Sequence, residues 1–329
     1  MPVSTTHTSL EAPVPKLLPV ITLLGGSGFV GTELTQRLAS EASQVRVLTR
    51  RAQRVKAFRI FANVDVIEVD IHDAAKLSAA IDGSDVVINL VGILNSSGGK
   101  PQNSFDGAHA DLTATVVKAC KTAGVPRYLH MSSLGADAQS GSSDYLKSKG
   151  AAENHVRAAK HLASTIFRPS VIFGPGDSFF NRFATLLQLA PVMPLACADA
   201  KLQPVYIGDV CEAMINALHN PDTVGQTFEL GGPDVFTLKE IVTMTAELKG
   251  LFRPIIALPD AIGKIQALCL EFVPGKPFSR DNFASLQTDN VLPEGVAPQP
   301  TSVSAVVPRY LGNTDLNGEL QSYRSMARR

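Results

Sequence analysis

The stretch that decides the fold is residues 20–31, which read VITLLGGSGFVG. An apolar run of strand length leads directly into glycines at 25, 28 and 31, and a helical pattern follows them. Gly25 permits a tight turn, Gly28 lets backbone amides approach a pyrophosphate, and Gly31 allows the helix to pack close to the strand. The positive end of that helix then faces the phosphates. Because a strand precedes the glycines and a helix follows them, we predict a dinucleotide-binding loop rather than an ordinary loop.

Short β-branched runs alternate with helix-length segments throughout the first half of the chain. This alternation is typical of a parallel α/β sheet, and runs that are apolar on both faces suit strands covered by helices on each side. We therefore predict a doubly wound Rossmann sheet. The expected strands are 20–24, 45–49, 64–69, 86–91, 128–131 and 165–167, and the expected helices are 32–39, 74–81, 108–122 and 145–159.

The composition changes after Pro169, where glycines and prolines punctuate the chain. We expect a flexible tail at residues 1–17, an NAD(P)-binding Rossmann domain at 18–175 and a smaller substrate lobe at 176–329. Within that lobe, residues 203–218 read as a strand and a helix, which we expect to return to the Rossmann domain.

One later segment, residues 261–272, places large apolar side chains at helical spacing. Such a stripe is usually a packed core face, and a surface for a membrane or a partner is the alternative. We therefore predict that this stripe is buried. Its members are Ile262, Ile265, Leu268, Cys269 and Phe272.

The charge balance and the apolar content exclude several classes of protein. Thirty basic and 30 acidic residues cancel, which argues against a nucleic-acid binder. With 45% hydrophobic residues the chain can bury a large core. The four cysteines have neither metal-ligand nor disulfide spacing, so we expect buried thiols in a reducing compartment and no metal. No apolar stretch is long enough to span a bilayer, which favours a cytoplasmic protein.

The residues after the second strand indicate which nicotinamide cofactor is held. NAD-specific Rossmann proteins usually place an acidic residue there, whereas this chain has Thr49, Arg50 and Arg51. Guanidinium groups suit a 2′-phosphate, so we favour NADP(H) over NAD(H). The alternative is that Arg50, Arg51 and Arg54 are only a solvated basic helix start. Asp70 either accepts a hydrogen bond from the adenine amino group or caps the following helix.

A tyrosine and a lysine stand four residues apart at the start of a predicted helix, as Tyr145 and Lys149. Both side chains then project from one face. An ammonium near the phenol lowers the pKa of the tyrosine from about 10, which suits an acid/base catalyst. Twelve residues earlier, Ser133 ends the fifth strand, where a hydroxyl could polarise a carbonyl that Tyr145 protonates. Ser132 is an equal candidate by chemistry.

Other polar residues have a simpler interpretation. His109 and His130 lack further ligands at metal spacing, so we predict core or helix histidines. Asp209 is predicted to cap a helix. Arg168 either pairs with a carboxylate or approaches the nicotinamide.

Together these residues carry a resemblance to a known superfamily. The glycines at 25, 28 and 31, Ser133 and the Tyr145/Lys149 pair are similar to those of the extended or atypical short-chain dehydrogenases/reductases. More narrowly, the chain resembles the branch that contains the nucleotide-binding accessory subunit of respiratory complex I and its bacterial relatives. The stretches that carry this narrower likeness are RPSVIFGPGD at 168–177, FFNRF at 179–183, QPVYIGDV at 203–210, RDN at 280–282, PT at 300–301 and PRYL at 308–311.

The resemblance implies a bound NADP(H) and, less directly, chemistry. Members of the superfamily oxidise and reduce sugar or alcohol carbons, whereas the complex I subunit holds its nucleotide for structural reasons, and some relatives are linked to ubiquinone biosynthesis. It thus implies either an oxidoreductase or epimerase acting on a carbonyl or carbinol carbon, or an accessory protein peripheral to a membrane or respiratory complex. The candidate cofactor-binding residues are Gly25, Ser27, Gly28, Phe29, Val30, Gly31, Arg50, Arg51, Asp70, Ile71, Leu90, Val91, Gly92, Lys149 and Pro169, and the candidate catalytic residues are Tyr145, Lys149 and Ser133.

Overall fold

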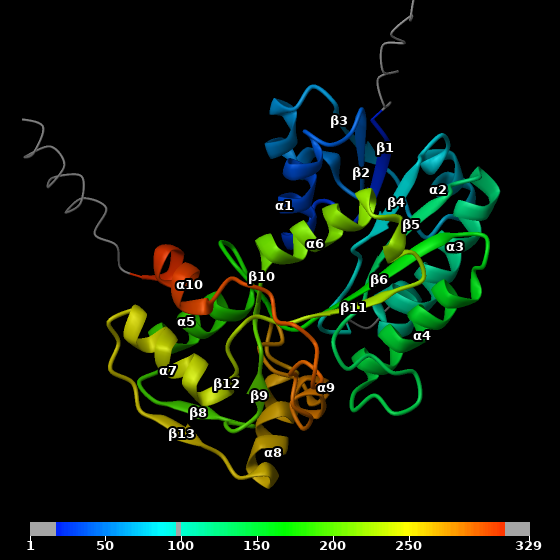
Figure 1. Ribbon diagram of the computed structural model, residues 1–329. Helices are drawn as coiled ribbons and strands as arrows, with labels where there is room; N and C mark the ends of the chain where they lie inside the picture. Colours follow the sequence, from blue (N-terminus) through cyan, green and yellow to red (C-terminus); the bar gives the residue numbers. More distant parts are fainter. Residues whose placement is uncertain (1–17, 97–99, 313–329) are drawn as a thin grey trace, which may run out of the picture.

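The computed structural model describes residues 18–96 and 100–312, so the tail expected at residues 1–17 lies outside the described residues. Seven parallel strands form the central sheet, in the order β11-β6-β5-β4-β1-β2-β3 (Figure 1). The strand order reverses between β1 and β4, which confirms the Rossmann arrangement. The strands are β1 (Val20–Leu24), β2 (Gln44–Thr49), β3 (Val64–Glu68), β4 (Val86–Asn89), β5 (Arg127–Met131), β6 (Ala163–Pro169) and β11 (Thr227–Leu230).

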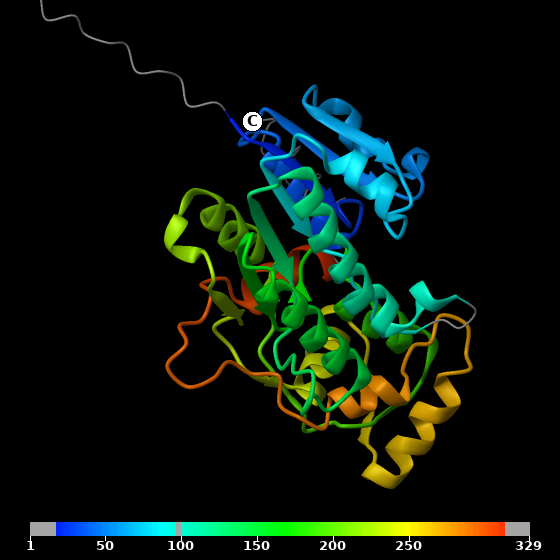
Figure 2. The same cartoon turned by 90° about the vertical axis from the view of Figure 1, so that its right-hand side faces the viewer.

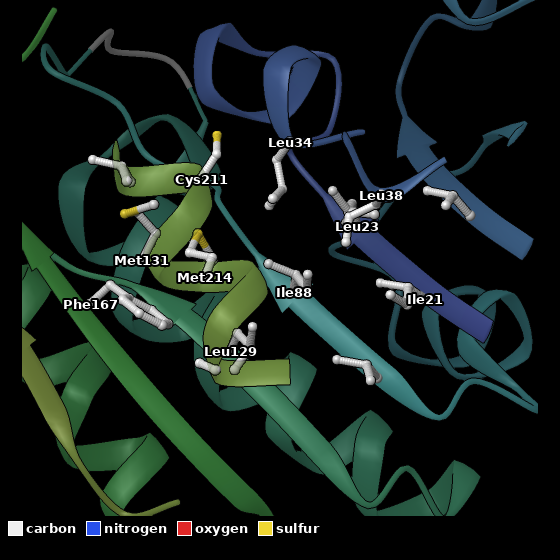
Figure 3. Packing of buried hydrophobic residues seen from close by; sticks show 14 of the residues in the cluster. Ile21, Leu23, Leu34, Leu38, Ile88, Leu129, Met131, Phe167, Cys211 and Met214 are labelled. Carbon is white, nitrogen blue, oxygen red and sulfur yellow. The ribbon is translucent and has the colours of Figure 1, made fainter. Parts of the chain in front are cut away.

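Helices cover both faces of this sheet, and neighbouring residues of one strand supply the two cores. Leu23 points to the face covered by α1 (Phe29–Leu38) and α6 (Ile207–His219), whereas Leu24 points to the opposite face. Figure 3 shows side chains of α1 and α6 over Ile21, Leu23, Ile88 and Leu129 of the sheet. The opposite face is covered by α2 (Ala74–Ile81), α3 (Leu112–Ala123) and α4 (Asp144–Ala158). Burial on both faces explains why the strands are apolar at successive positions.

The helix expected at residues 108–122 begins differently from the prediction. Its first turn, Gly107–Asp111, is a π-helical turn that continues into α3. A Cβ on Gly107 would lie 2.1 Å from the carbonyl oxygen of Pro101, so only glycine allows the short helix η3 (Pro101–Asn103) to lie against this turn. A π-helical turn within a helix is common at functional sites.

The remaining elements form a second lobe with its own apolar core (Figure 2). This core gathers α5 (Phe179–Leu189), α7 (Leu238–Leu248) and α10 (Val303–Leu311). Three small sheets pair β7 (Ile172–Phe173) with β10 (Val205–Tyr206), β9 (Lys201–Leu202) with β12 (Phe236–Thr237), and β8 (Met193–Leu195) with β13 (Ile255–Ala257). The second lobe also contains α8 (Asp260–Leu270) and α9 (Arg280–Ser285). The short helices η1 (Ala52–Arg54), η2 (Lys56–Ile60) and η5 (Pro221–Thr223) belong to the first lobe instead, where η1 and η2 contact β3 and η5 contacts α6.

The prediction that the apolar stripe of residues 261–272 is buried is wrong. Ile262, Ile265 and Phe272 are 50%, 60% and 80% exposed. The side of α8 that packs against the lobe consists of Gly263 and Ala267 instead. A Cβ on Gly263 would lie 2.9 Å from the Phe283 ring, so close helix packing selects small residues there and leaves the large ones outside.

Asp209 does not cap α6, which corrects a second prediction. The residue before the helix is Tyr206, whose side chain provides no capping hydrogen bond. The Asp209 carboxylate accepts hydrogen bonds from the backbone N–H and the hydroxyl of Thr301, at 3.0 and 2.8 Å. This carboxylate therefore connects the segment before α10 to α6 by hydrogen bonds.

Candidate functional site

The glycine loop joins β1 to α1 in the geometry that a phosphate site requires. Gly25 has a φ of +77°, and a Cβ on Gly31 would lie 2.3 Å from the carbonyl oxygen of Gly25. Both positions therefore need glycine. Gly28 precedes α1, and no side chain caps the first-turn N–H groups of this helix. A cavity of about 520 Å³ begins at Ser27 and Gly28 and extends along one side of α1. This cavity is lined by Ser27, Gly28, Phe29, Thr32, Glu33, Gln36, Pro175, Gly176, Tyr206 and Ile207.

A second cavity, of about 1000 Å³, extends from within β2 and β3 past their carboxyl ends and is also lined by α2. Arg50 and Asp70 line it, as do His72, Lys76 and Lys100, so the cavity is rich in cationic and imidazole groups. Glu68 also lines it. Its carboxylate accepts a hydrogen bond from the N–H of Ala52 at 2.9 Å.

Two alternatives for these residues can now be separated. Asp70 accepts a hydrogen bond from the N–H of His72, whereas Asp73 caps α2 by accepting from Ala75 and Lys76. The capping role therefore belongs to Asp73.

Arg51 is not among the described residues that line the second cavity, and its N–H donates to the Thr49 hydroxyl at 3.3 Å. The side chain of Arg54 lies outside the described part of the chain.

The other candidate cofactor residues follow β3, β4 and β6. The backbone of Leu90 and Val91 runs 3.1 Å from the place that a Cβ on Gly25 would occupy, so the two loops are in contact. Ile71 packs against the core beneath α2, and the carbonyl of Pro169 accepts a hydrogen bond from the N–H of Leu134. Val30 opens α1 beside Phe29, and Gly92 lies next to Lys149. The candidates thus lie along the carboxyl edge of the sheet, where α/β proteins bind ligands.

Tyr145 and Lys149 lie one turn apart near the start of α4, and Ser143 caps this helix by accepting from the N–H of Leu146. The Lys149 ammonium donates to the carbonyl oxygens of Met131 and Val91, at 3.1 and 3.4 Å. Burial lowers the pKa of Lys149 to about 8. The expected lowering of the Tyr145 pKa is wrong, since burial raises the pKa of this phenol and the hydrogen bond with Ser133 only opposes that rise.

The two serines that the sequence could not separate have different partners. The Ser132 hydroxyl donates to the buried carboxylate of Glu153 at 2.5 Å. The same carboxylate receives two hydrogen bonds from Arg168, both 2.7 Å long. Ser133 is the serine within hydrogen-bond reach of the Tyr145 phenol. Ser132 is thus engaged by Glu153, and Ser133 faces the tyrosine.

His109 is a part of the site whose role the sequence did not indicate. Its Nε2 accepts the N–H of Ile93 at 3.0 Å, so its proton is on Nδ1, which donates to the Ser148 hydroxyl at 2.8 Å. Burial lowers the pKa of His109 to about 2, and its ring lies edge-on to Tyr145 with 5.5 Å between centroids. The imidazole therefore stays neutral and joins the loop after β4 to the helix of Tyr145. Both His109 and His130 are buried, and the described residues contain no cluster that could hold a metal.

The second lobe reaches the same helix through Asp281 of α9. Its carboxylate accepts hydrogen bonds from the N–H groups of Asp144 and Tyr145, at 2.7 and 3.4 Å. A carboxylate stabilises a helix N-terminus in this position. No spacing in the sequence indicates this contact, because 136 residues separate Asp281 from Tyr145.

The buried Lys149 ammonium gives a pH-dependent stability that can be measured. Between pH 8 and about 10.5, the folded protein has lost this proton while the unfolded chain retains it, so the free energy of unfolding gains up to about 1.4 kcal/mol per pH unit from this group. We expect that gain to be absent from Lys149→Met. Urea unfolding of both proteins at pH 8 and pH 10 measures it. An equal pH dependence in the two proteins would contradict a buried ammonium.

The fold and the site together define a protein of the extended short-chain dehydrogenase/reductase class. Residues 21–231 match the NAD dependent epimerase/dehydratase family, and the chain belongs to this family. A nicotinamide dinucleotide is the cofactor that the family description names. The glycine loop fits such a group, because it has no space for side chains at Gly25 and Gly31 and leads into a helix N-terminus that no side chain caps.

Curated relatives and solved structures agree with this membership. The chain is 31% identical over 289 residues to NADH dehydrogenase [ubiquinone] 1 alpha subcomplex subunit 9, mitochondrial, of Arabidopsis thaliana, covering 83% of this chain and 71% of that one. It is 30% identical over 243 residues to a ceramide reductase of Caulobacter vibrioides, covering 73% and 74%. A dTDP-glucose 4,6-dehydratase of Streptomyces venezuelae, solved with NAD, has a TM-score of 0.67 at 19% identity, covering 89% and 95%, which shows a shared fold. Across the described residues, no helix is long and apolar enough to cross a membrane.

Proposed function

We propose that this protein is an NADP(H)-dependent oxidoreductase of the short-chain type that acts on a carbonyl or carbinol carbon. The observation that supports it is the Ser133, Tyr145 and Lys149 constellation beside the glycine loop, at one edge of the sheet. The ceramide reductase among the relatives favours reduction.

Each member of the constellation has a distinct role in this proposal. The Tyr145 phenol gives a proton to the substrate oxygen during reduction and takes it back during oxidation. Ser133 donates a hydrogen bond to the same oxygen and stabilises the charge that develops there. Lys149 donates to the Val91 and Met131 carbonyls, which hold its ammonium in place, and it would donate to the nicotinamide ribose of a bound cofactor. The nicotinamide supplies the hydride.

The experiment that tests this proposal is a cofactor and substrate screen. Isothermal titration calorimetry of the full chain with NADPH and NADH tests binding, and NADPH oxidation against a panel of ketones, aldehydes and quinones tests turnover. We expect micromolar binding of NADPH and turnover of at least one carbonyl compound. If neither nucleotide gives heat of binding, the proposal fails.

Arg50 is proposed to contact the 2′-phosphate, because it lines the second cavity after β2. Changing Arg50 to Asp removes a charge-assisted hydrogen bond and adds repulsion, so we expect NADPH to bind roughly tenfold to 100-fold more weakly while NADH is little affected. Arg59→Asp, an equal charge change at an exposed position of η2, is the control. An unchanged ratio of the two affinities in Arg50→Asp would refute the assignment.

A second candidate function is a nucleotide-binding accessory or assembly protein of respiratory complex I or of quinone metabolism, peripheral to the membrane. The mitochondrial complex I subunits among the relatives favour it. In that role the nucleotide stabilises the fold by binding to it and does not turn over. Bound nucleotide retained through purification, without turnover of any carbonyl compound, would support this candidate over the first.

A further inference from the structure

The outward face of α8 and the turn after it presents a continuous apolar surface, which we call the α8 crest. Ile265 and Phe272 are 60% and 80% exposed. The residues of the crest recur every three or four positions and lie opposite Gly263 and Ala267, which face the lobe. Large apolar side chains outside and small ones inside reverse the pattern of an ordinary surface helix. The crest consists of Ile262, Ile265, Leu268, Cys269, Phe272 and Val273.

The crest lies at one end of the molecule and in a positively charged segment. Figures 1 and 2 both place α8 at the extremity of the second lobe, away from β2 and β3. Residues 252–280 contain four basic and two acidic side chains, of which Arg280 and Glu271 form an ion pair at 2.7 Å, so the segment carries a small positive excess whereas the whole chain is neutral. Lys264 is exposed on α8 and, at about 100° per residue, flanks the crest on the side of Leu268. An exposed apolar helix face flanked by a basic side chain suits the interface of an anionic lipid surface.

We propose that the α8 crest docks this protein on an anionic lipid bilayer, with the large side chains among the acyl chains and Lys264 at the phosphates. A second copy of the chain is disfavoured as the occupant, because two crests face to face would bring two positive segments together. A bilayer instead offers negative charge and apolar depth at one surface.

The contacts after the crest connect it to the helix of Tyr145. The Lys276 ammonium donates to the Ser96 carbonyl at 2.6 Å, and Asn282 donates to the Leu94 carbonyl at 3.4 Å. Asp281, which lies between these two residues in sequence, accepts hydrogen bonds from the first turn of α4. A docked crest therefore brings the catalytic helix close to the lipid surface. This step, which rests on the proposed function, favours a substrate that partitions into membranes, whereas the docking itself does not depend on turnover.

Cosedimentation of the full chain with lipid vesicles tests the proposal. We expect binding to vesicles of phosphatidylcholine and phosphatidylglycerol in equal parts, weaker binding at high salt, and little binding to phosphatidylcholine alone. The double variant Ile265→Asp, Phe272→Asp should lower the partition coefficient by roughly tenfold or more, and Lys264→Glu by roughly fivefold. The control is Ile60→Asp, since Ile60 is 81% exposed in the first lobe.

Three outcomes would overturn the proposal. One is failure of the wild type to bind the anionic vesicles, and another is equal binding by the wild type and the double variant. The third is a wild-type dimer in sedimentation equilibrium that the double variant abolishes, because the crest would then join two copies. Nucleotide affinity, measured on the same preparations, should be unchanged in all variants. This affinity shows that each variant is folded. It also distinguishes a failure of the docking proposal from a failure of the cofactor proposal.

Discussion

Replacing Glu153 with glutamine is expected to destabilise the protein by about 3–5 kcal/mol, because it breaks a buried ion pair and leaves the Arg168 charge with a weaker partner. Glu153 is fully buried and receives hydrogen bonds from Ser132, Arg157 and Arg168. After its loss, Arg168 keeps Glu229 of β11 as its one ion-pair partner among the described residues, at 3.3 Å. The midpoint of urea unfolding measures the change.

Glu33→Gln is the matched control for this prediction. Glu33 also forms an ion pair with an arginine, Arg37, four residues along a helix, at 2.9 Å. Both of those side chains are about one-third exposed, so we expect a loss below about 1 kcal/mol. Similar losses in the two variants would contradict the view that the buried cluster around Glu153 stabilises the sheet. The cluster joins α4 to β6 and β11, and it also fixes the strand end that carries Ser133.

Local patterns in the sequence predicted the central sheet because each strand and each helix there follows one rule. Strands buried on both faces are apolar at most positions, and Gly28 and Gly31 are needed for close contacts with Gly25, a few residues away. The strand bounds differ from the prediction by at most two residues, as at β4, which ends at Asn89. At this strand end the side-chain oxygen of Asn89 accepts a hydrogen bond from the N–H of Val91.

The features that the sequence did not predict depend on contacts between distant segments. The period of α8 was predicted correctly and its buried face was not, because Phe283 and Ala196 leave space only for Gly263 and Ala267. The choice between Ser132 and Ser133 depends on Glu153, which lies 21 residues beyond Ser132. The hydrogen bond from the Tyr145 N–H to Asp281 requires the second lobe to pack against the first. None of these contacts leaves a periodic signal in the chain.

Removing the phenolic oxygen of Tyr145 is expected to abolish most of any turnover. In the variant Tyr145→Phe the reacting proton has no donor, so we expect kcat to fall by roughly 10²–10⁴ for whichever carbonyl compound the wild type reduces. The aromatic ring remains in its contacts with His109 and Phe105, so the fold and the nucleotide affinity should be kept. NADPH oxidation and calorimetry on the same preparation separate the two effects.

The two serines provide the control that distinguishes proton transfer from packing. Ser133→Ala should lower kcat with little effect on stability, since its hydroxyl faces the tyrosine. Ser132→Ala should lower stability instead, because it removes a hydrogen bond from the buried Glu153 carboxylate. If Tyr145→Phe and Ser133→Ala both turn over like the wild type, the acid/base role is refuted. If the wild type itself binds NADPH and reduces nothing, the cofactor acts by stabilising the fold, and the second candidate function then accounts for the site.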